Sequence, residues 1–337
     1  MSLEKILKRR EMFLAILIVV LSLVTNYVNP SFLTYGNITD LLKAFTVLGI
    51  FSLGVLMVIV SGGFDVSFTA IAQVTQYGIV ALMIHMGGGN IYMAIAGAML
   101  AGLILGVING AIIHFFNMPA IIVTIATQSL FYGIMYVVTE GRLIYDIPSY
   151  FWTFADTKLL TVTAENGVVS GIALVTALWV ALGVVLFLFL NYTKLGRSVY
   201  AIGGNRISAE RIGFNLCRTT LFVYGAMGAI AGFAGMVHVS IVQSVIPNSI
   251  VGSEMQVIAA VVLGGASVTG GKGSVLGTFL GVLLFAILSN SLTLLKISSY
   301  YYNVFTGLII LVSIVANAVQ AQRQKRARVR VQIDEGI

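Results

Sequence analysis

The sequence predicts an all-α polytopic membrane protein of about ten transmembrane helices, with both termini in the cytoplasm. Of its 337 residues, 58% are hydrophobic and only 9% are charged, whereas a soluble domain carries about a quarter charged residues. The shortage of charge extends along the whole chain, so no water-soluble domain is expected. A helix needs roughly 20 apolar residues to cross a bilayer, which leaves room for about ten crossings in one membrane domain.

Apolar runs and the residues that interrupt them define the expected helices. Asn29-Pro30, Ser61-Gly62-Gly63 and Gly87-Gly88-Gly89 end the first three runs, because these residue types are typical of helix ends and turns. Pro119 suits the first turn of the fifth helix. The expected helices cover residues 12–28, 43–60, 67–86, 91–115, 119–138, 170–190, 218–241, 254–267, 274–294 and 300–319.

The first apolar run follows basic residues and could be mistaken for a signal peptide. It is longer than the apolar region of a signal peptide, and no small-residue cleavage site follows it. We therefore expect it to be retained as the first helix. The expected organisation is an N-terminal cytoplasmic arm at 1–11, a transmembrane domain at 12–319 that includes a polar loop at 139–169 and a cytoplasmic segment at 191–217, and a basic cytoplasmic tail at 320–337.

The positions of the basic residues predict the orientation. Most of the 19 Lys and Arg residues lie in the arm, in segment 191–218, at Lys272 and in the tail. Those on the other side of a ten-helix arrangement are Lys43, Arg142, Lys158 and Lys296. Loops rich in Lys and Arg stay in the cytoplasm, so both termini are expected there. The basic clusters favour anionic lipid as a contact, and no aromatic residues alternate with them as in a nucleic-acid surface.

Glycine recurs every four residues in several expected helices. Small residues on one helix face let two backbones approach closely in lipid. The spacing indicates either packing within one chain or an interface between subunits. The repeats are Gly102, Gly106 and Gly110, then Gly228 and Gly232, then Gly273, Gly277 and Gly281.

Segment 61–67 interrupts two apolar runs with a glycine pair and a carboxylate. An ionised Asp inside a membrane costs about 2.5–3.5 kcal/mol, so Asp65 needs water, a partner or a helix N-terminus. Asp65 or Ser67 could cap the next helix, or the segment could have a gating or pathway role. Other polar residues of the apolar runs could line a polar path or hydrogen-bond between helices. They are Gln73, Gln76, Asn109, Gln128, Gln256 and Asn290.

Segment 191–217 contains the second candidate site. Asn205 suits a helix N-cap and Gly213 a helix end, which predicts about two turns of helix between them. The short helix would lie across the cytoplasmic face, with Ala209 and Ile212 on one side. It could rest on anionic lipid or fit a groove of a soluble partner. The candidate residues are Gly196, Arg197, Asn205, Arg206, Glu210, Arg211 and Gly213.

No pattern in the sequence predicts a catalytic or metal centre. Gly270-Gly271-Lys272 resembles a phosphate-binding loop, but Ala266 stands where the first glycine should be and Gly273 follows the lysine. Cys217 is the only cysteine, and the three histidines fall in different helices without ligand spacing. We expect no catalytic residue, metal or cofactor in this chain, so any ATP would be bound by partner subunits.

Three segments together resemble the ribose-type, monosaccharide permeases of ABC importers, which are related to branched-chain amino acid permeases. The segments are 61–67, 195–215 and 258–278, and the resemblance covers roughly residues 40–317. It implies a bacterial inner-membrane protein that works with a second permease chain, identical or paralogous, with cytoplasmic ATP-binding subunits and with an extracytoplasmic solute-binding protein. It also implies that residues 196–215 dock onto the ATPase. Phe64, Thr69 and Gln256 depart from the family pattern, which has Ile, Gly and Asp there.

The function that the resemblance implies is import of a monosaccharide or similarly sized polar solute by alternating access, driven by the ATPase subunits. The binding protein is expected on the outer loops, chiefly 139–169 and 242–253. The main alternative is a secondary transporter or channel driven by an ion gradient, with Asp65 as the proton or sodium site. Two further alternatives are a branched-chain amino acid permease and a membrane-embedded enzyme, which the absence of a catalytic cluster disfavours.

Overall fold

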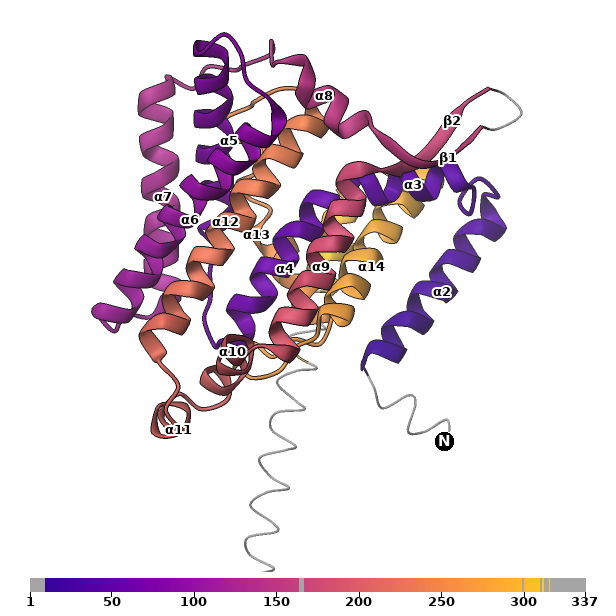
Figure 1. Cartoon of the computed structure of the whole chain (residues 1–337). Coiled ribbons are helices and arrows are strands. Elements are labelled where there is room, and N and C mark those ends of the chain that lie inside the picture. The colour runs from indigo at the N-terminus through magenta and orange to yellow at the C-terminus, as the bar shows by residue number, and fades with distance from the viewer. Residues whose placement is uncertain (1–9, 164–166, 299, 310, 312–314, 316–337) are drawn as a thin grey trace, which may run out of the picture.

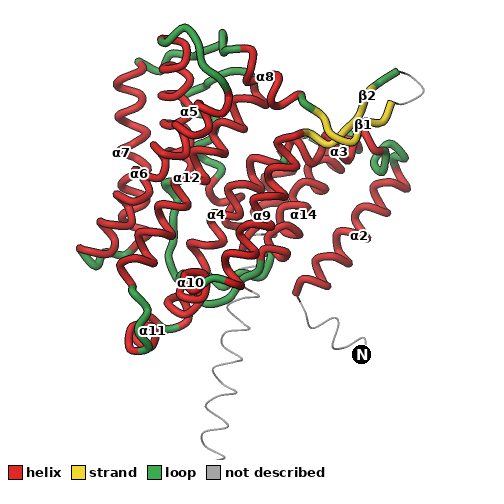
Figure 2. The backbone as a smooth tube through the Cα atoms, viewed as in Figure 1, coloured by secondary structure: helices red, strands yellow, loops and turns green. Residues whose placement is uncertain are grey.

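The computed structural model describes residues 10–163, 167–298, 300–309, 311 and 315. This part of the chain is mostly helical (Figures 1 and 2). Its first helices are α2 (Arg10–Val28), α3 (Tyr35–Ala44), α4 (Thr46–Val60), α5 (Phe68–His85), α6 (Ile91–Phe115), α7 (Ala120–Thr139) and α8 (Ser149–Asp156). After a short hairpin follow α9 (Leu174–Tyr192), α10 (Lys194–Gly204), α11 (Arg206–Arg211), α12 (Leu216–Val242), α13 (Glu254–Leu263) and α14 (Val275–Leu294).

Seven of the described helices, α2, α5, α6, α7, α9, α12 and α14, are long and apolar enough to cross a membrane. Helices α3 and α4 qualify together as an eighth crossing, with a bend of 50° between them. Helix α13 has ten residues and rises about 15 Å, roughly half of what a bilayer core requires. Residues 300–309 are also helical. A polytopic helical membrane protein is therefore confirmed, whereas ten crossings stay a prediction.

The loop expected at 139–169 has more structure than predicted. It contains α8 and the start of an antiparallel hairpin, β1 (Lys158–Thr163) and β2 (Val169–Ala173), in which Lys158 lies opposite Ala173. The all-α class fits the chain apart from this short hairpin, where Leu, Val and Thr residues around 159–163 favour an extended backbone. The N-terminal arm before Arg10 and the basic tail at 320–337 lie outside the described residues.

Helices α6 and α12 pack backbone against backbone. A methyl group at Gly102 would lie 2.1 Å from the carbonyl oxygen of Gly228, and one at Gly228 would lie 2.0 Å from the carbonyl oxygen of Gly102. Helices α13 and α14 meet in the same way, since a methyl group at Gly281 would lie 2.0 Å from the carbonyl oxygen of Ala260. These glycine repeats therefore pack helices within one chain, as one of the two interpretations predicted.

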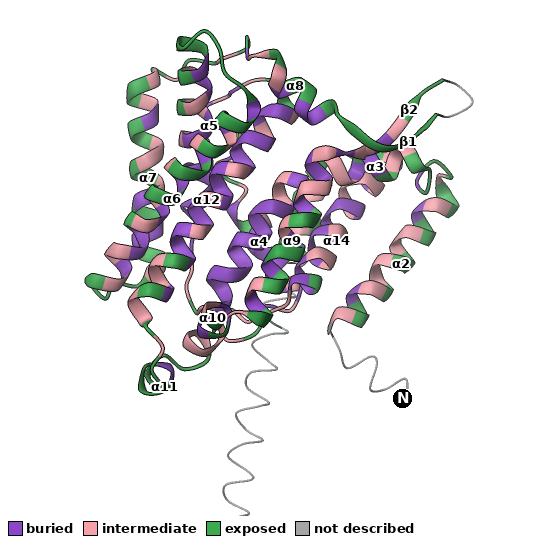
Figure 3. Ribbon diagram, in the orientation of Figure 1, coloured by how far each residue is buried: buried purple, intermediate pink, exposed green. Residues whose placement is uncertain are grey.

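Helix α4 is buried along nearly its whole length, whereas α2 stands at the edge of the molecule (Figure 3). Two polar contacts fasten α2 to α14: the hydroxyl groups of Thr25 and Ser291 are 2.8 Å apart, and the Asn29 amide donates to the Leu294 carbonyl at 3.2 Å. Most large side chains of α2 on the other faces are exposed apolar residues, as expected of a helix whose neighbour is lipid.

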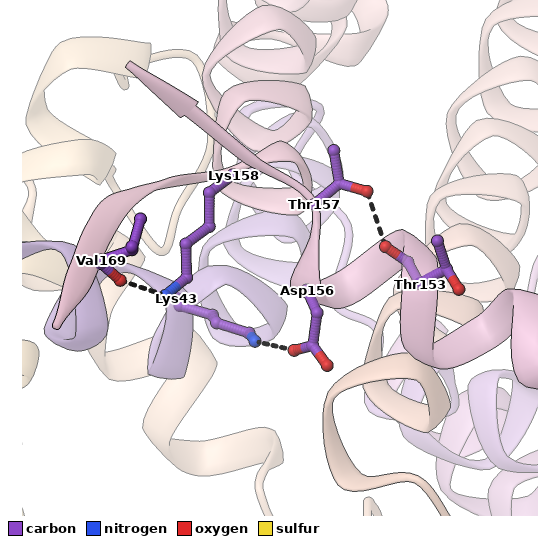
Figure 4. Close-up of polar contacts among 6 residues, drawn as sticks. All are labelled: Lys43, Thr153, Asp156, Thr157, Lys158 and Val169. Carbon is purple, nitrogen blue, oxygen red and sulfur yellow. Dashed lines mark hydrogen bonds and ion pairs between the residues drawn. The ribbon is translucent and has the colours of Figure 1, made fainter. Parts of the chain in front are cut away.

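The hairpin and α8 lie at the end of the molecule opposite to α10 and α11 (Figure 1). An ion pair of 2.9 Å between Lys43 Nζ and Asp156 Oδ1 links α3 to α8 (Figure 4). Within the hairpin, Lys158 Nζ donates to the Val169 carbonyl at 2.8 Å, and the Tyr35 hydroxyl of α3 donates to the Leu160 carbonyl at 2.6 Å. These contacts fix α8 and the hairpin onto α3.

Candidate functional site

Glycines from three distant parts of the sequence meet at the end of α10. We call this contact of Gly62, Gly203, Gly204, Gly270 and Gly271 the glycine junction. A methyl group at Gly203 would lie 1.9 Å from the Val60 carbonyl oxygen, and one at Gly270 would lie 2.6 Å from the Gly203 carbonyl oxygen. The Gly271 amide donates to the same Val60 oxygen at 2.9 Å. The junction is therefore built from main chain, and a side chain at Gly203 or Gly270 would not fit into it.

The backbone geometry of the junction explains why its residues are glycines. Gly62, Gly270 and Gly271 have φ angles of +79°, +85° and +73°, a region that L-residues other than glycine rarely adopt. The Ser267 amide donates to the Lys272 carbonyl at 2.9 Å, which closes the loop on itself. The Gly-Gly-Lys sequence thus forms a contact surface for α10.

Two side chains fix α10 in place on the junction. The Tyr200 hydroxyl donates to the Gly273 carbonyl at 2.9 Å, and burial raises the pKa of Tyr200, which keeps this donor protonated. The hydroxyl groups of Ser198 and Thr219 are 3.0 Å apart and join α10 to α12. Helix α10 therefore contacts α4, α12 and the loop before α14 at once.

The predicted short helix exists as α11. The Asn205 side chain accepts from the Ser208 amide at 2.9 Å at its start, and Gly213 follows its end with a φ angle of +97°. The expectation that Ala209 and Ile212 share a side is wrong: Ala209 is 2% exposed, whereas Ile212, just beyond the helix, is 76% exposed. Ile207 is exposed to 65%, so α11 presents apolar side chains to its surroundings.

The seven residues proposed from the sequence for this segment lie on α10, on α11 or directly beside them. Gly196 is buried against the Phe189 carbonyl, where a methyl group would lie at 2.2 Å. The others are all exposed: Arg197, Asn205, Arg206, Glu210, Arg211 and Gly213. The side chains of Arg197, Arg206, Glu210 and Arg211 can therefore contact a partner, while Asn205 caps α11 and Gly196 serves the packing of α10 on α9.

Asp65, Ser67 and Asn109 form one buried cluster. Asp65 is 3% exposed, and its Oδ1 accepts from the Ser67 amide at 2.7 Å and the Ser67 hydroxyl at 2.6 Å. The Asn109 amide of α6 donates to the Ser67 hydroxyl at 2.7 Å. Ser67 occupies the N-cap position of α5, but its side chain makes no capping bond. The carboxylate thus organises the segment between α4 and α5 and ties it to α6.

Helix α5 carries a row of polar side chains along one face, because residues 69, 73 and 76 are spaced by four and three positions. The Gln73 amide donates to the Ile246 carbonyl at 2.9 Å, and its oxygen accepts from the Ile250 amide at 3.2 Å. Gln76 Oε1 lies 3.1 Å from His238 Nδ1 of α12. Gln73 and Gln76 are fully buried, so both join segments of the chain to one another.

Two residues of this region were not among the site candidates from the sequence: Thr69, which was noted only as a departure from the family pattern, and Glu254. Glu254 is 7% exposed and accepts from Gln128 Nε2 at 2.6 Å and from the Thr69 hydroxyl. The helical spacing of Thr69 with Gln73 and Gln76 was the signal available for the first. An acidic residue that opens an apolar run, where it suits a helix start, was the signal for the second.

The remaining predicted pathway residues lie elsewhere. Gln256 of α13 is hydrogen-bonded to the Tyr302 hydroxyl. Asn290 of α14 forms a reciprocal amide pair with Asn37 of α3, with N to O distances of 2.9 and 3.0 Å. Within the described part of the chain, no three His, Cys, Asp or Glu side chains lie together as a metal site requires.

Comparison with known proteins places this arrangement in a family. Residues 37–314 match the family described as branched-chain amino acid transport system / permease component. The ribose import permease protein RbsC of Haemophilus influenzae is 33% identical over 302 residues, which cover 90% of this chain and 91% of that protein. RbsC of Bacillus subtilis is 34% identical over 88% of each chain. No solved structure matches the chain.

A relative with another sugar in its name also aligns along most of the chain. The L-arabinose ABC transporter permease protein AraH of Azospirillum brasilense is 29% identical, over 90% of this chain and 85% of that protein. The family match includes all three segments of the glycine junction, and systems of this family contain ATP-binding subunits and a solute-binding protein. The chain therefore belongs to the branched-chain amino acid transport permease family and, within it, to the ribose-type ABC transporter permeases, as a multi-pass protein of the bacterial inner membrane.

Proposed function

We propose that this chain is the membrane-spanning permease subunit of a binding-protein-dependent ABC importer for a monosaccharide or similarly sized polar solute. The solute crosses by alternating access, driven by ATP hydrolysis in partner subunits. The solute class is supported by the relatives named for ribose and arabinose import.

The proposed topology has ten crossings with both termini in the cytoplasm. Seven long helices and the bent α3–α4 pair supply eight, and α13 with its preceding segment and the helix from residue 300 onward supply the other two. The hairpin end is then outside and the α11 end inside. This assignment keeps Arg206 and Arg211 in the cytoplasm, and places α8, the hairpin and the segment 242–253 where a solute-binding protein would dock.

The observation that carries the coupling proposal is the glycine junction. A force on α11 or α10 from a bound ATPase would act directly on the main chain of Val60 and Gly271, without flexible side chains in between. Val60 ends α4 and leads into the segment that holds Asp65 and Ser67. The surface offered to the partner is apolar with a charged rim, as protein interfaces often are. Ile207 and Ile212 are exposed, and the charged side chains around them are Arg206, Glu210 and Arg211.

Reconstitution with the ATP-binding subunits and the binding protein tests this function. Uptake into vesicles should require ATP, the ATP-binding subunits and the binding protein. The Arg197→Ala and Glu210→Ala variants should lose solute-stimulated ATP hydrolysis and uptake together. If both activities survive in these variants, the coupling assignment is wrong. If this chain alone accumulates solute from a proton or sodium gradient, the secondary transporter with Asp65 as its ion site is the better description.

A further inference from the structure

Glu254 is a buried carboxylate at the place where two helices begin. It is the first residue of α13, and the Thr69 hydroxyl that contacts it belongs to the first turn of α5. Its other side-chain partner, Gln128, lies near the middle of α7 (Ala120–Thr139). The carboxylate is thus placed well inside the membrane-spanning part of the molecule, where charged side chains are rare and usually serve function.

Neutral donors from three parts of the chain surround this carboxylate. Oε1 accepts from the Gln128 amide at 2.6 Å, from the Thr69 hydroxyl and from the Gly252 amide at 3.0 Å, and Oε2 lies 3.1 Å from the same Gly252 nitrogen. Neither of the ion pairs found between described residues involves Glu254. Because the bonds come from α5, α7 and the segment before α13, they join these three elements at one point.

The segment 243–253 has no regular structure, and α5 holds it. Besides the bond of Thr69 to Glu254, Gln73 contacts the Ile246 carbonyl and the Ile250 amide at 2.9 and 3.2 Å. The segment runs from the outer loops, where Val245 pairs with Ile144, to the buried Glu254. At membrane depth, irregular backbone is tolerated only where protein buries it or where it lines a cavity. The polar face of α5 therefore replaces the hydrogen bonds that this segment would otherwise lack.

The two sides of α13 are held by different kinds of contact. On one side it meets α14 backbone to backbone, through Ala260 with Gly281 and through Gly264 with Gly277. The loop that follows α13 continues into Gly270 and Gly271 of the glycine junction. On the other side, at its start, α13 is joined to α5 and α7 through the side chains of Glu254, Thr69 and Gln128. Close-packed backbones move as one body, whereas side-chain hydrogen bonds can break and re-form.

We propose that Glu254 is a positioning residue for transport: it latches α13 to α5 and α7 in the state described here, and its bonds to Thr69 and Gln128 break in each transport cycle. A movement that reaches the glycine junction from α10 passes along α13 and α14 and separates the start of α13 from α5. This inference rests on the proposed function, because it requires a cycle that α10 drives.

We call the hydrogen bonds of Glu254 with Thr69 and Gln128 the latch. Cross-linking the latch in the complete reconstituted complex tests whether it must open. In a Cys217→Ser background, Thr69→Cys and Glu254→Cys are joined by a short bifunctional thiosulfonate, and uptake is compared before linking, after linking and after reduction. We expect linking to reduce uptake at least tenfold and reduction to restore it. The control pair, Thr46→Cys with Thr176→Cys, joins the first turns of α4 and α9, where the two hydroxyl groups are 3.0 Å apart, and should retain uptake when linked. A linked latch that transports at its unlinked rate overturns the proposal.

A single substitution tests the same latch without removing the carboxylate. Thr69→Val keeps the side-chain shape but loses the donor, so α13 should separate too easily. We expect solute-independent ATP hydrolysis to rise several-fold and uptake per ATP to fall, with Thr69→Ser close to the unaltered protein. The matched control is Thr75→Val in the same helix, because the Thr75 hydroxyl bonds only to α5 backbone at 2.8 and 3.1 Å.

The ratio of uptake to ATP hydrolysis separates the possible outcomes. A merely structural role for Thr69 would lower the amount of folded complex and leave the ratio unchanged, as for Thr75→Val, and this result would contradict the latch. If uptake by the unaltered complex does not depend on ATP at all, the proposed function itself fails, and this control is measured first.

Discussion

Gly203 of α10 lies directly against the carbonyl group of Val60, the last residue of α4. A methyl group on Gly203 would be 1.9 Å from that oxygen, which also accepts the Gly271 amide at 2.9 Å. One residue further on, a methyl group at Gly204 would find no atom within 4 Å. The two neighbouring glycines of the same helix therefore differ completely in what they tolerate.

The first prediction uses this difference. Gly203→Ala should push α10 away from α4 and reduce ATP-driven uptake by at least tenfold, whereas Gly204→Ala should leave uptake within about twofold of the unaltered protein. Uptake is measured in vesicles that contain equal amounts of assembled complex, so that a loss of protein is not counted as a loss of coupling. Equal uptake by the two variants would show that the junction transmits nothing.

The second prediction concerns the contact of α6 with α12. Gly228→Ala places a methyl group 2.0 Å from the Gly102 carbonyl oxygen and should destabilise the protein by about 1–3 kcal/mol, as overpacking does. Gly133→Ala in α7 meets nothing within 4 Å and should stabilise it by up to about 1 kcal/mol through helix propensity. Thermal unfolding in detergent compares the two. A higher Tm for Gly228→Ala would contradict the packing.

The third prediction tests α11 as the surface for the ATP-binding subunit. Ile212→Asp puts a charge on an apolar side chain that is 76% exposed and should reduce copurification of the ATP-binding subunit at least fivefold. Leu160→Asp, on the hairpin at the opposite end, alters a side chain that is 77% exposed and should have no effect on that copurification. Tight binding of the ATPase to the Ile212 variant would place the docking surface elsewhere.

The fourth prediction concerns the ion pair of Lys43 and Asp156. The side chain of Asp156 is 59% exposed, so the pair should contribute less than about 1 kcal/mol. Lys43→Glu should lower the Tm slightly, and adding Asp156→Lys should recover most of the loss by restoring the pair in reverse. The loss should shrink at high salt, because salt screens exposed charges. A Tm of the double variant below that of the single variant would argue against a direct pair.

The fifth prediction concerns orientation. In a Cys217→Ser background, a cysteine at Leu160 should react with a membrane-impermeant maleimide added outside spheroplasts, whereas a cysteine at Ile212 should react only after the membrane is opened. Both side chains are exposed, so accessibility to the reagent depends on the side of the membrane. The reverse pattern would invert the proposed topology.

The sequence was sufficient to predict the membrane class, most helix positions and the short helix between Asn205 and Gly213. These features depend on local properties: long apolar runs, glycine and proline at helix ends, and a side chain that caps its own helix. It was insufficient where the chain departs from regular crossings. Helix α13 ends after ten residues, a boundary that tertiary contacts determine. The hairpin occupies part of an expected loop, because its β-favouring run at 159–163 is short and lies among polar residues.

The candidate residues divide in the same way. Asp65, Ser67 and Asn109 could be named as polar residues of apolar runs, but their contact joins positions 42 residues apart and needed the packed helices to be seen. Thr69 and Glu254 lie 185 residues apart in the sequence. Helical spacing places residues on one face of their own helix, but it does not determine which face of another helix they meet.

What the sequence alone determined is therefore the kind of protein and the three glycine-containing segments that mark its family. Only the tertiary structure decided that these segments touch, and that Glu254 holds together the starts of two helices. The physical reason is that apolar periodicity encodes the affinity of a segment for lipid. The partners of a glycine or of a buried carboxylate depend on which backbones can approach within hydrogen-bond distance after the helices have packed.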